Sequence, residues 1–184
     1  MKALPNWILY RLENRGADKP TKVPYTVGGS HAKTNDSSTW AMFDVALAAF
    51  QRGRYAGLGF VFTGTPYVGI DIDECVDPVN GKASPKAQDA VRILNSYTEF
   101  SQSGKGLHII IKGKLPAGRR RNGAFEMYGE GSPRYFAMTG DVWDGLFDIC
   151  ENQAAIDEVH RKYIQPEEKD RSATKAAAAP TRPP

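Results

Sequence analysis

The segment 67–73 (YVGIDID) constrains the fold more than any other, because apolar and acidic side chains alternate along it. On a β-strand, successive side chains point to opposite faces, so Val68, Ile70 and Ile72 are predicted to share a buried face. Asp71 and Asp73 then share the opposite face, with Cα atoms about 6.6 Å apart. The chain must therefore build a sheet with one covered face and one face that carries neighbouring carboxylates.

Further strand-like segments follow one another, most of them separated by short turns. They are predicted at 6–13, 22–27, 57–62, 97–101, 107–112, 124–128 and 134–139. N-capping residues predict helices that begin after 37–39 and after 84–85, and a third helix is predicted over roughly 151–163. Many short strands and few helices predict an α+β fold, a largely antiparallel sheet with helices packed on it.

The last part of the chain differs in composition from the rest. Residues 166–184 contain four prolines and neither an aromatic nor a branched aliphatic residue. Such a segment cannot bury enough apolar surface to order itself. We therefore expect one folded domain at 1–165, followed by a tail or linker at 166–184.

The composition of the 184 residues, 41% hydrophobic and 24% charged, is that of an ordinary soluble protein. No apolar run approaches the roughly 20 residues that span a bilayer. The apolar run before Arg11 is also too short for the hydrophobic region of a secretory leader. The two cysteines, Cys75 and Cys150, form neither a disulfide framework nor a zinc knuckle. We expect a cytoplasmic protein with no membrane partner.

The acid pair Asp71 and Asp73 is the sharpest chemical signal. Two carboxylates this close repel each other unless a cation lies between them. Oxygen ligands favour Mg²⁺ or Mn²⁺, which bridge substrate phosphates. The alternative is a solvent-facing strand with ordinary surface acids, which would have the same sequence pattern. An EF-hand loop fails because Cys75 and Val76 stand where it needs an oxygen ligand and a glycine. Neither a P-loop nor an HExxH motif occurs.

A turn of small residues, SQSGKGLH at 101–108, ends in His108 at the start of an apolar strand. Its backbone N–H groups and the Lys105 cation are suited to phosphate oxygens, and the His108 ring can reach a ligand held there. An ordinary hairpin turn has the same composition, and for this segment alone it is the simpler interpretation.

Glu126 is a third acid, between Phe125 and Met127 in a predicted strand. An acid among bulky apolar residues needs a partner. A metal at Asp71 and Asp73 would provide one, whereas Arg134 could either pair with Glu126 or bind a phosphate.

Charge is distributed unevenly although the net charge is only +3. The stretch 112–122 contains five basic residues and no acid, while 71–77 contains four acids. A basic lobe beside an acidic spot suits a polyanion that must meet metal ions, and a solvated basic turn is the alternative.

In combination, an acid pair, a phosphate-binding turn and a third acid are the components of two-metal nucleotidyl transfer. The chain resembles the bifunctional primase–polymerase (prim-pol) domain of the archaeo-eukaryotic primase superfamily, of the phage, prophage and plasmid type. The motifs are Gly69-Ile-Asp71-Ile-Asp73, Ser103-Gly-Lys-Gly-Leu-His108 and Phe125-Glu126-Met-Tyr. Further family-like segments, among them NWILYRLE, TKVPYT and RYFAMTG, extend the resemblance over about residues 5–145.

The resemblance implies an RRM-like catalytic sheet with flanking helices beside a small N-terminal αβ unit. It also implies a nucleotidyltransferase that makes and extends primers from (d)NTPs on single-stranded DNA. A helicase or a helical priming module, fused or separate, would be its partner. By position, Asp71, Asp73 and Glu126 would be catalytic and hold Mg²⁺ or Mn²⁺, and Ser103, Lys105, His108 and Arg134 would bind the nucleotide. Lys112, Lys114, Arg119, Arg120 and Arg121 would contact the template, and Lys22 is a weaker candidate.

Two other functions share parts of this pattern. A non-catalytic module that binds single-stranded DNA or a replication origin would keep the fold, but clustered acids near DNA bring it no advantage. A DxD-type glycosyltransferase would explain Asp71 and Asp73, but not the turn that ends in His108.

Overall fold

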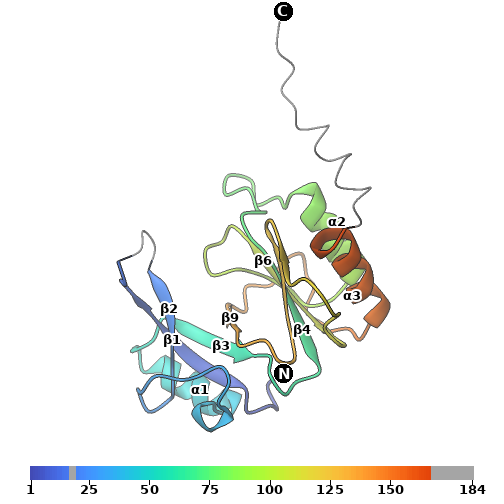
Figure 1. Ribbon diagram of the computed structural model, residues 1–184. Helices are drawn as coiled ribbons and strands as arrows, with labels where there is room; N and C mark the ends of the chain where they lie inside the picture. Colours follow the sequence, from blue (N-terminus) through green and yellow to red (C-terminus); the bar gives the residue numbers. More distant parts are fainter. Residues whose placement is uncertain (17–19, 167–184) are drawn as a thin grey trace, which may run out of the picture.

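In this computed structural model, which describes residues 1–16 and 20–166, the chain forms two antiparallel β-sheets with three α-helices packed on them (Figure 1). The α+β class predicted from the sequence is confirmed. Of the predicted tail at 166–184, all but residue 166 lies outside the described residues. None of the helices in the described ranges has the length and apolar character to cross a membrane.

The smaller sheet has four strands in the order β2-β1-β3-β9. They are β1 (Trp7–Glu13), β2 (Thr21–Tyr25), β3 (Gly57–Val61) and β9 (Tyr135–Met138). Trp7 and Leu9 on one face pack against the helix α1 (Phe43–Gln51). Because β9 comes from far along the chain, the unit predicted as N-terminal is completed by a strand that follows all three sequence motifs.

The helix predicted to begin after 37–39 begins later than expected. Residues Ser37–Thr39 form a 3₁₀ turn, capped by the Asp36 carboxylate, which accepts from the Ser38 N–H at 3.1 Å. Ala41 then exchanges two backbone hydrogen bonds with Trp7, which holds the chain extended until α1 starts. The predicted capping residues 37–39 therefore do not cap α1, whose N-cap is Met42, because the pairing of Ala41 with β1 keeps the chain extended up to that point.

The larger sheet has five strands in the order β5-β6-β4-β8-β7. They are β4 (Tyr67–Ile72), β5 (Thr98–Phe100), β6 (Leu107–Lys112), β7 (Arg121–Asn122) and β8 (Phe125–Tyr128). The helices α2 (Pro85–Leu94) and α3 (Gln153–Val159) cover one face, and α3 continues as a π-helix, His160–Ile164. As predicted, Ser84 caps α2 by accepting from the Ala87 N–H at 3.4 Å.

The side chains that the alternation placed inside are buried against these helices. Val68, Ile70 and Ile72 are at most 1% exposed and belong to one core cluster with Phe125 and Met127. The opposite face of β4, which carries Asp71, is consequently turned away from the helices and toward the four-stranded sheet.

The turn at 64–66 connects β3 to β4, which lie in different sheets and therefore do not form a hairpin. β3 pairs with β1 and β9, whereas β4 pairs with β6 and β8. Between them, the buried Phe62 packs its ring edge-on against Phe136 at 4.9 Å. The sheets therefore meet at this aromatic contact, beside the acid face of β4.

Candidate active site

Five ionisable side chains form a single row across all five strands of the larger sheet. The cross-strand register pairs Glu99 with His108, His108 with Asp71, Asp71 with Glu126, and Glu126 with Arg121. Directly opposed residues of antiparallel strands have Cβ atoms about 4.5–5.5 Å apart, so each side chain has its neighbours within contact range. We call this set the charged row.

The charged row runs from the interior to the surface. Glu99 is fully buried, His108 is 4% exposed, and the Arg121 side chain at the other end is 67% exposed. Asp71 lies in the middle, between the His108 ring and the Glu126 carboxylate. The two adjacent acids, Asp71 and Glu126, are the place in the row where negative charge accumulates.

The Asp71 carboxylate lies in an environment that disfavours its negative charge. Its Oδ1 is buried and has no hydrogen-bond partner among the described residues, with the His108 Nε2 at 3.8 Å. Burial raises the pKa of Asp71 to about 6, and the carboxylates of Asp73 and Glu126 add to this increase, while His108 opposes it. A divalent cation would compensate this buried charge, so the donor set fits Mg²⁺ or Mn²⁺.

The carboxylates of Asp71, Asp73 and Glu126 do not converge on one point in this structure. Within residues 1–16 and 20–166, no group of three or more His, Cys, Asp or Glu side chains is arranged to hold a metal ion. Glu126 turns its Oε1 to the Arg121 Nε at 2.9 Å, and Asp73 is exposed just past the end of β4. The partner of Glu126 is thus Arg121, and the pairing with Arg134 that the sequence left open is not formed.

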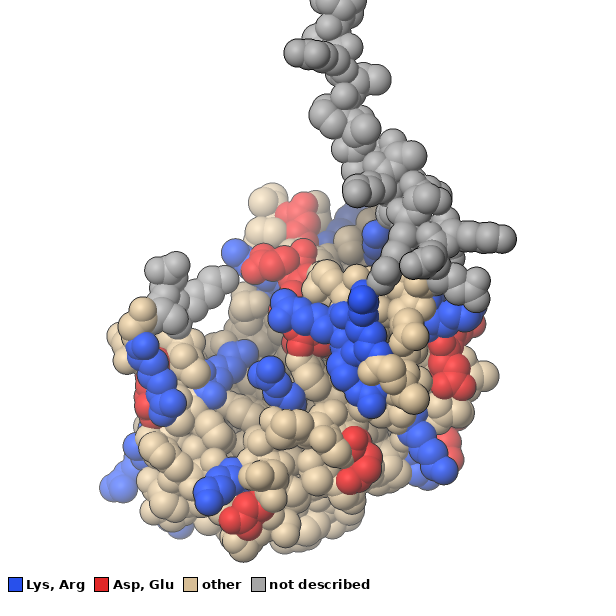
Figure 2. All heavy atoms as spheres, viewed as in Figure 1, with Lys and Arg blue, Asp and Glu red and all other residues tan. Residues whose placement is uncertain are grey.

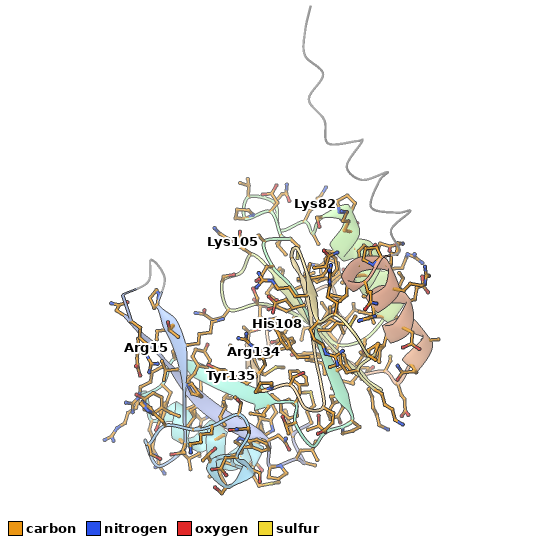
Figure 3. All side chains as sticks on the ribbon, viewed as in Figure 1. Arg15, Lys82, Lys105, His108, Arg134 and Tyr135 are labelled. Atoms are coloured by element: carbon orange, nitrogen blue, oxygen red, sulfur yellow. The ribbon has the colours of Figure 1, made fainter. Side chains whose placement is uncertain are left out.

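A cavity of about 390 Å³ opens beside Asp71 and His108, between the two sheets. The four-stranded sheet contributes Lys22 and Tyr135, and Arg134 projects from the loop before β9 (Figure 3). Burial lowers the pKa of Lys22, against the opposing influence of the carboxylates of Asp71 and Asp73. The cavity therefore places two cations, Lys22 and Arg134, near a carboxylate. This arrangement suits a phosphate that arrives with a metal ion.

The predicted phosphate-binding turn lies next to the acids but faces a different hollow. Gly106 packs so closely on the end of β4 that a Cβ there would be 2.8 Å from the Ile72 carbonyl oxygen. The Ser103 hydroxyl lies 3.2 Å from the Ser101 hydroxyl and accepts from the Lys105 N–H at 3.3 Å. Lys105 lines a neighbouring hollow together with Lys82 (Figure 3). Of the predicted nucleotide ligands, only His108 and Arg134 share the cavity with Asp71.

The predicted template-binding residues divide into two groups. Lys112 lies at the far end of β6 and forms an ion pair with Glu151 at 2.6 Å, whereas Lys114 is tied through its backbone to Gln153. The segment that contains Arg119, Arg120 and Arg121 leads into the strands β7 and β8, next to Glu126. Over the segment coloured gold in Figure 1, Figure 2 shows a group of Lys and Arg side chains.

Two members of the charged row have places that the sequence did not indicate. Glu99 lies in a segment predicted to be a strand, but nothing local shows that it opposes His108. Arg121 was assigned to template contact, and its pairing with Glu126 depends on the two-residue strand β7, which is too short to be recognised from alternation.

An α+β fold of two antiparallel sheets, with paired carboxylates beside a cation-lined cavity, is compatible with the fold of primase–polymerases. In an alignment of 158 residues that covers 82% of this chain, the chain is 35% identical to a protein named DNA Primase-polymerase from Nitratiruptor phage NrS-1. The relationship to phage-type primase–polymerases that the motifs indicated is thereby confirmed. The chain spans 21%, about a fifth, of that protein's length. No family model matches the chain.

Proposed function

We propose that this chain is the catalytic domain of a DNA primase–polymerase, which joins nucleotides from (d)NTPs on a single-stranded DNA template during phage- or plasmid-type replication. The observation that carries the proposal is the position of Asp71. One oxygen of its carboxylate, Oδ1, is buried and lacks a hydrogen-bond partner among the described residues. Asp71 also adjoins a second acid and a histidine, and it lines a cavity with two cationic side chains. A purely structural strand position would not retain such an unfavourable charge.

In this proposal, Asp71, Asp73 and Glu126 hold the divalent metal ions. When bound, Mg²⁺ or Mn²⁺ would activate the primer 3′-hydroxyl and neutralise the departing pyrophosphate. Glu126 must leave Arg121 to join the other two acids, and the exposed Arg121 side chain is free to turn toward a template phosphate. The five-stranded sheet would then be the RRM-like catalytic sheet of the superfamily.

The remaining residues bind and orient the substrates. His108, Arg134 and Lys22 surround the cavity and would contact the triphosphate, with Ser103 and Lys105 joining from the neighbouring turn. The basic residues Lys112, Lys114, Arg119, Arg120 and Arg121 would follow the template backbone, a contact that does not depend on sequence and weakens with salt. A helicase or a helical priming module, fused or separate, would complete primer synthesis in the cell.

The test is incorporation of labelled nucleotides on single-stranded DNA, with and without a primer, in Mg²⁺ and in Mn²⁺. We expect metal-dependent product that falls by at least about 10³-fold in Asp71→Asn, because the substitution keeps the shape and removes the charge. Asp148→Asn, at an exposed position outside the cavity, is the matched control and should be fully active. Product formed without a primer would add primer initiation to the activity.

The competing function is a non-catalytic module that binds single-stranded DNA. It predicts no incorporation by the folded wild-type protein, together with single-strand binding that Asp71→Asn leaves unchanged. Circular dichroism of both proteins would establish that each is folded, so that lost incorporation could be assigned to the site.

A further inference from the structure

Glu99 is a fully buried side chain whose carboxylate accepts three hydrogen bonds and makes a fourth contact with the His108 ring. Its Oε2 accepts from the Tyr97 hydroxyl at 2.7 Å and from the Gly140 N–H at 2.9 Å. Its Oε1 accepts from the Thr139 N–H at 3.1 Å and lies 3.3 Å from the His108 Nδ1. An ionised carboxylate has about four acceptor sites and no proton to give, and three of these sites are filled by the Tyr97, Thr139 and Gly140 donors.

This arrangement determines which nitrogen of His108 carries a proton. Because an ionised Glu99 can only accept, the Nδ1 that faces Oε1 is then the N–H side of the ring. The other nitrogen, Nε2, points in the opposite direction, toward the Oδ1 of Asp71 at 3.8 Å and the cavity that His108 lines. Glu99 and Asp71 thus flank the ring on its two nitrogens.

The ring is also held from its face. His108 stacks on Phe136 with the ring centroids 4.4 Å apart and the planes 20° from parallel. Phe136 belongs to β9, and the next turn of the chain supplies the Thr139 and Gly140 N–H groups that bind Glu99. One short segment therefore fixes both the ring plane and the carboxylate that orients it.

We propose that Glu99 is a positioning residue, which holds His108 with its Nδ1 proton inward so that Nε2 faces the incoming triphosphate. The inference rests on the proposed function, since it assumes that His108 contacts the nucleotide. Glu99 itself is fully buried and does not line the cavity, so it acts through His108. Second-layer carboxylates that orient a histidine by this contact recur in functional sites.

The geometry is tested in the wild-type protein by long-range ¹H–¹⁵N NMR of its three histidines, with His108 assigned from a His108→Gln variant. We expect a protonated Nδ1 in the wild type and a mixture of tautomers in Glu99→Gln. In that variant, the amide NH₂ faces a backbone N–H in either orientation, that of Gly140 or that of Thr139, and in the second orientation it also faces the His108 ring. A wild-type Nδ1 without its proton would overturn the proposal, and this measurement needs no variant of Glu99.

The consequence is tested by binding of a non-hydrolysable deoxynucleoside triphosphate with Mg²⁺, without DNA. Glu99→Gln should raise the dissociation constant about tenfold, as expected for loss of one charge-assisted contact. Ser96→Ala is the control, because Ser96 is equally buried and bonds to the Ile110 carbonyl rather than to His108. This control should bind as tightly as the wild type even where its melting temperature falls.

The binding series separates this proposal from the proposed function. Weaker binding in both His108→Ala and Glu99→Gln supports both. Weaker binding in His108→Ala alone, with Glu99→Gln folded, overturns the role of Glu99 and leaves the proposed function standing. Normal binding in His108→Ala would overturn the role of Glu99, because that role acts through His108, whereas the proposed function is decided separately by the incorporation test with Asp71→Asn.

Discussion

Replacing Asp71 by asparagine should stabilise the folded protein at neutral pH although it removes an acid required for the proposed activity. One oxygen of the Asp71 carboxyl, Oδ1, is buried without a hydrogen-bond partner among the described residues, and burial raises the pKa of this carboxyl from an ordinary 3.8 to about 6. A tenfold change in proton affinity corresponds to about 1.4 kcal/mol, so keeping this group ionised costs the folded state about 3 kcal/mol. Asparagine has nearly the same shape and carries no charge.

The sign of the effect depends on pH. Below about pH 3 the carboxyl is protonated in the folded and unfolded states alike, so it carries no penalty. As the pH rises toward 6, the unfolded chain releases the proton while the folded chain retains it, and stability falls. Above about pH 6 the full penalty is present. The advantage of Asp71→Asn over the wild type should therefore appear between pH 4 and 6 and persist at pH 7.5.

The assay is thermal and urea unfolding in EDTA at pH 4.0 and pH 7.5, with Asp148→Asn as control. A gain of about 3 kcal/mol corresponds to a melting temperature about 6–12 °C higher for a domain of this size. The reasoning is refuted if Asp71→Asn has wild-type stability at pH 7.5. It is equally refuted if the gain is the same at pH 4.0, because burial of the charge would then not be its cause.

Three further perturbations test neighbouring parts of the site. Excess Mg²⁺ or Mn²⁺ at pH 7.5 should stabilise the wild type by about 2.7 kcal/mol at one hundred times its dissociation constant, and should leave the melting temperature of Asp71→Asn unchanged. Gly69→Ala would bring a methyl group to 2.6 Å from the Phe136 ring. It should lower the free energy of unfolding in urea by about 1–3 kcal/mol and weaken nucleotide binding. Gly28→Ala is the control, because its methyl group would make only ordinary contacts and should have neither effect. Arg121→Ala should change stability by less than about 1 kcal/mol, because the pair with Glu126 is largely exposed at the arginine. It should reduce the salt dependence of single-strand binding by about one in log–log slope, and an unchanged slope would contradict a template contact.

Features that depend on neighbours in the sequence could be predicted without the structure. The alternation in 67–73 places Val68, Ile70 and Ile72 in the core and Asp71 on the other face, because the side-chain period of a strand is two whatever the strand pairs with. The same rule places Glu126 opposite to Phe125, and the Ser84–Pro85 start of α2 follows from local capping. The candidate acids and His108 could thus be named from the sequence.

The charged row itself was decided by tertiary structure. Register is set by pairing between residues far apart in the chain, and a slip of one residue would have turned Asp71 away from both His108 and Glu126. For the same reason, the burial of Glu99 beside His108 and the division of β3 and β4 between two sheets were not visible in the sequence. The sequence by itself determined which side chains carry the chemistry. Only the long-range register decided which of them lie next to each other, because it is set by pairing between distant residues.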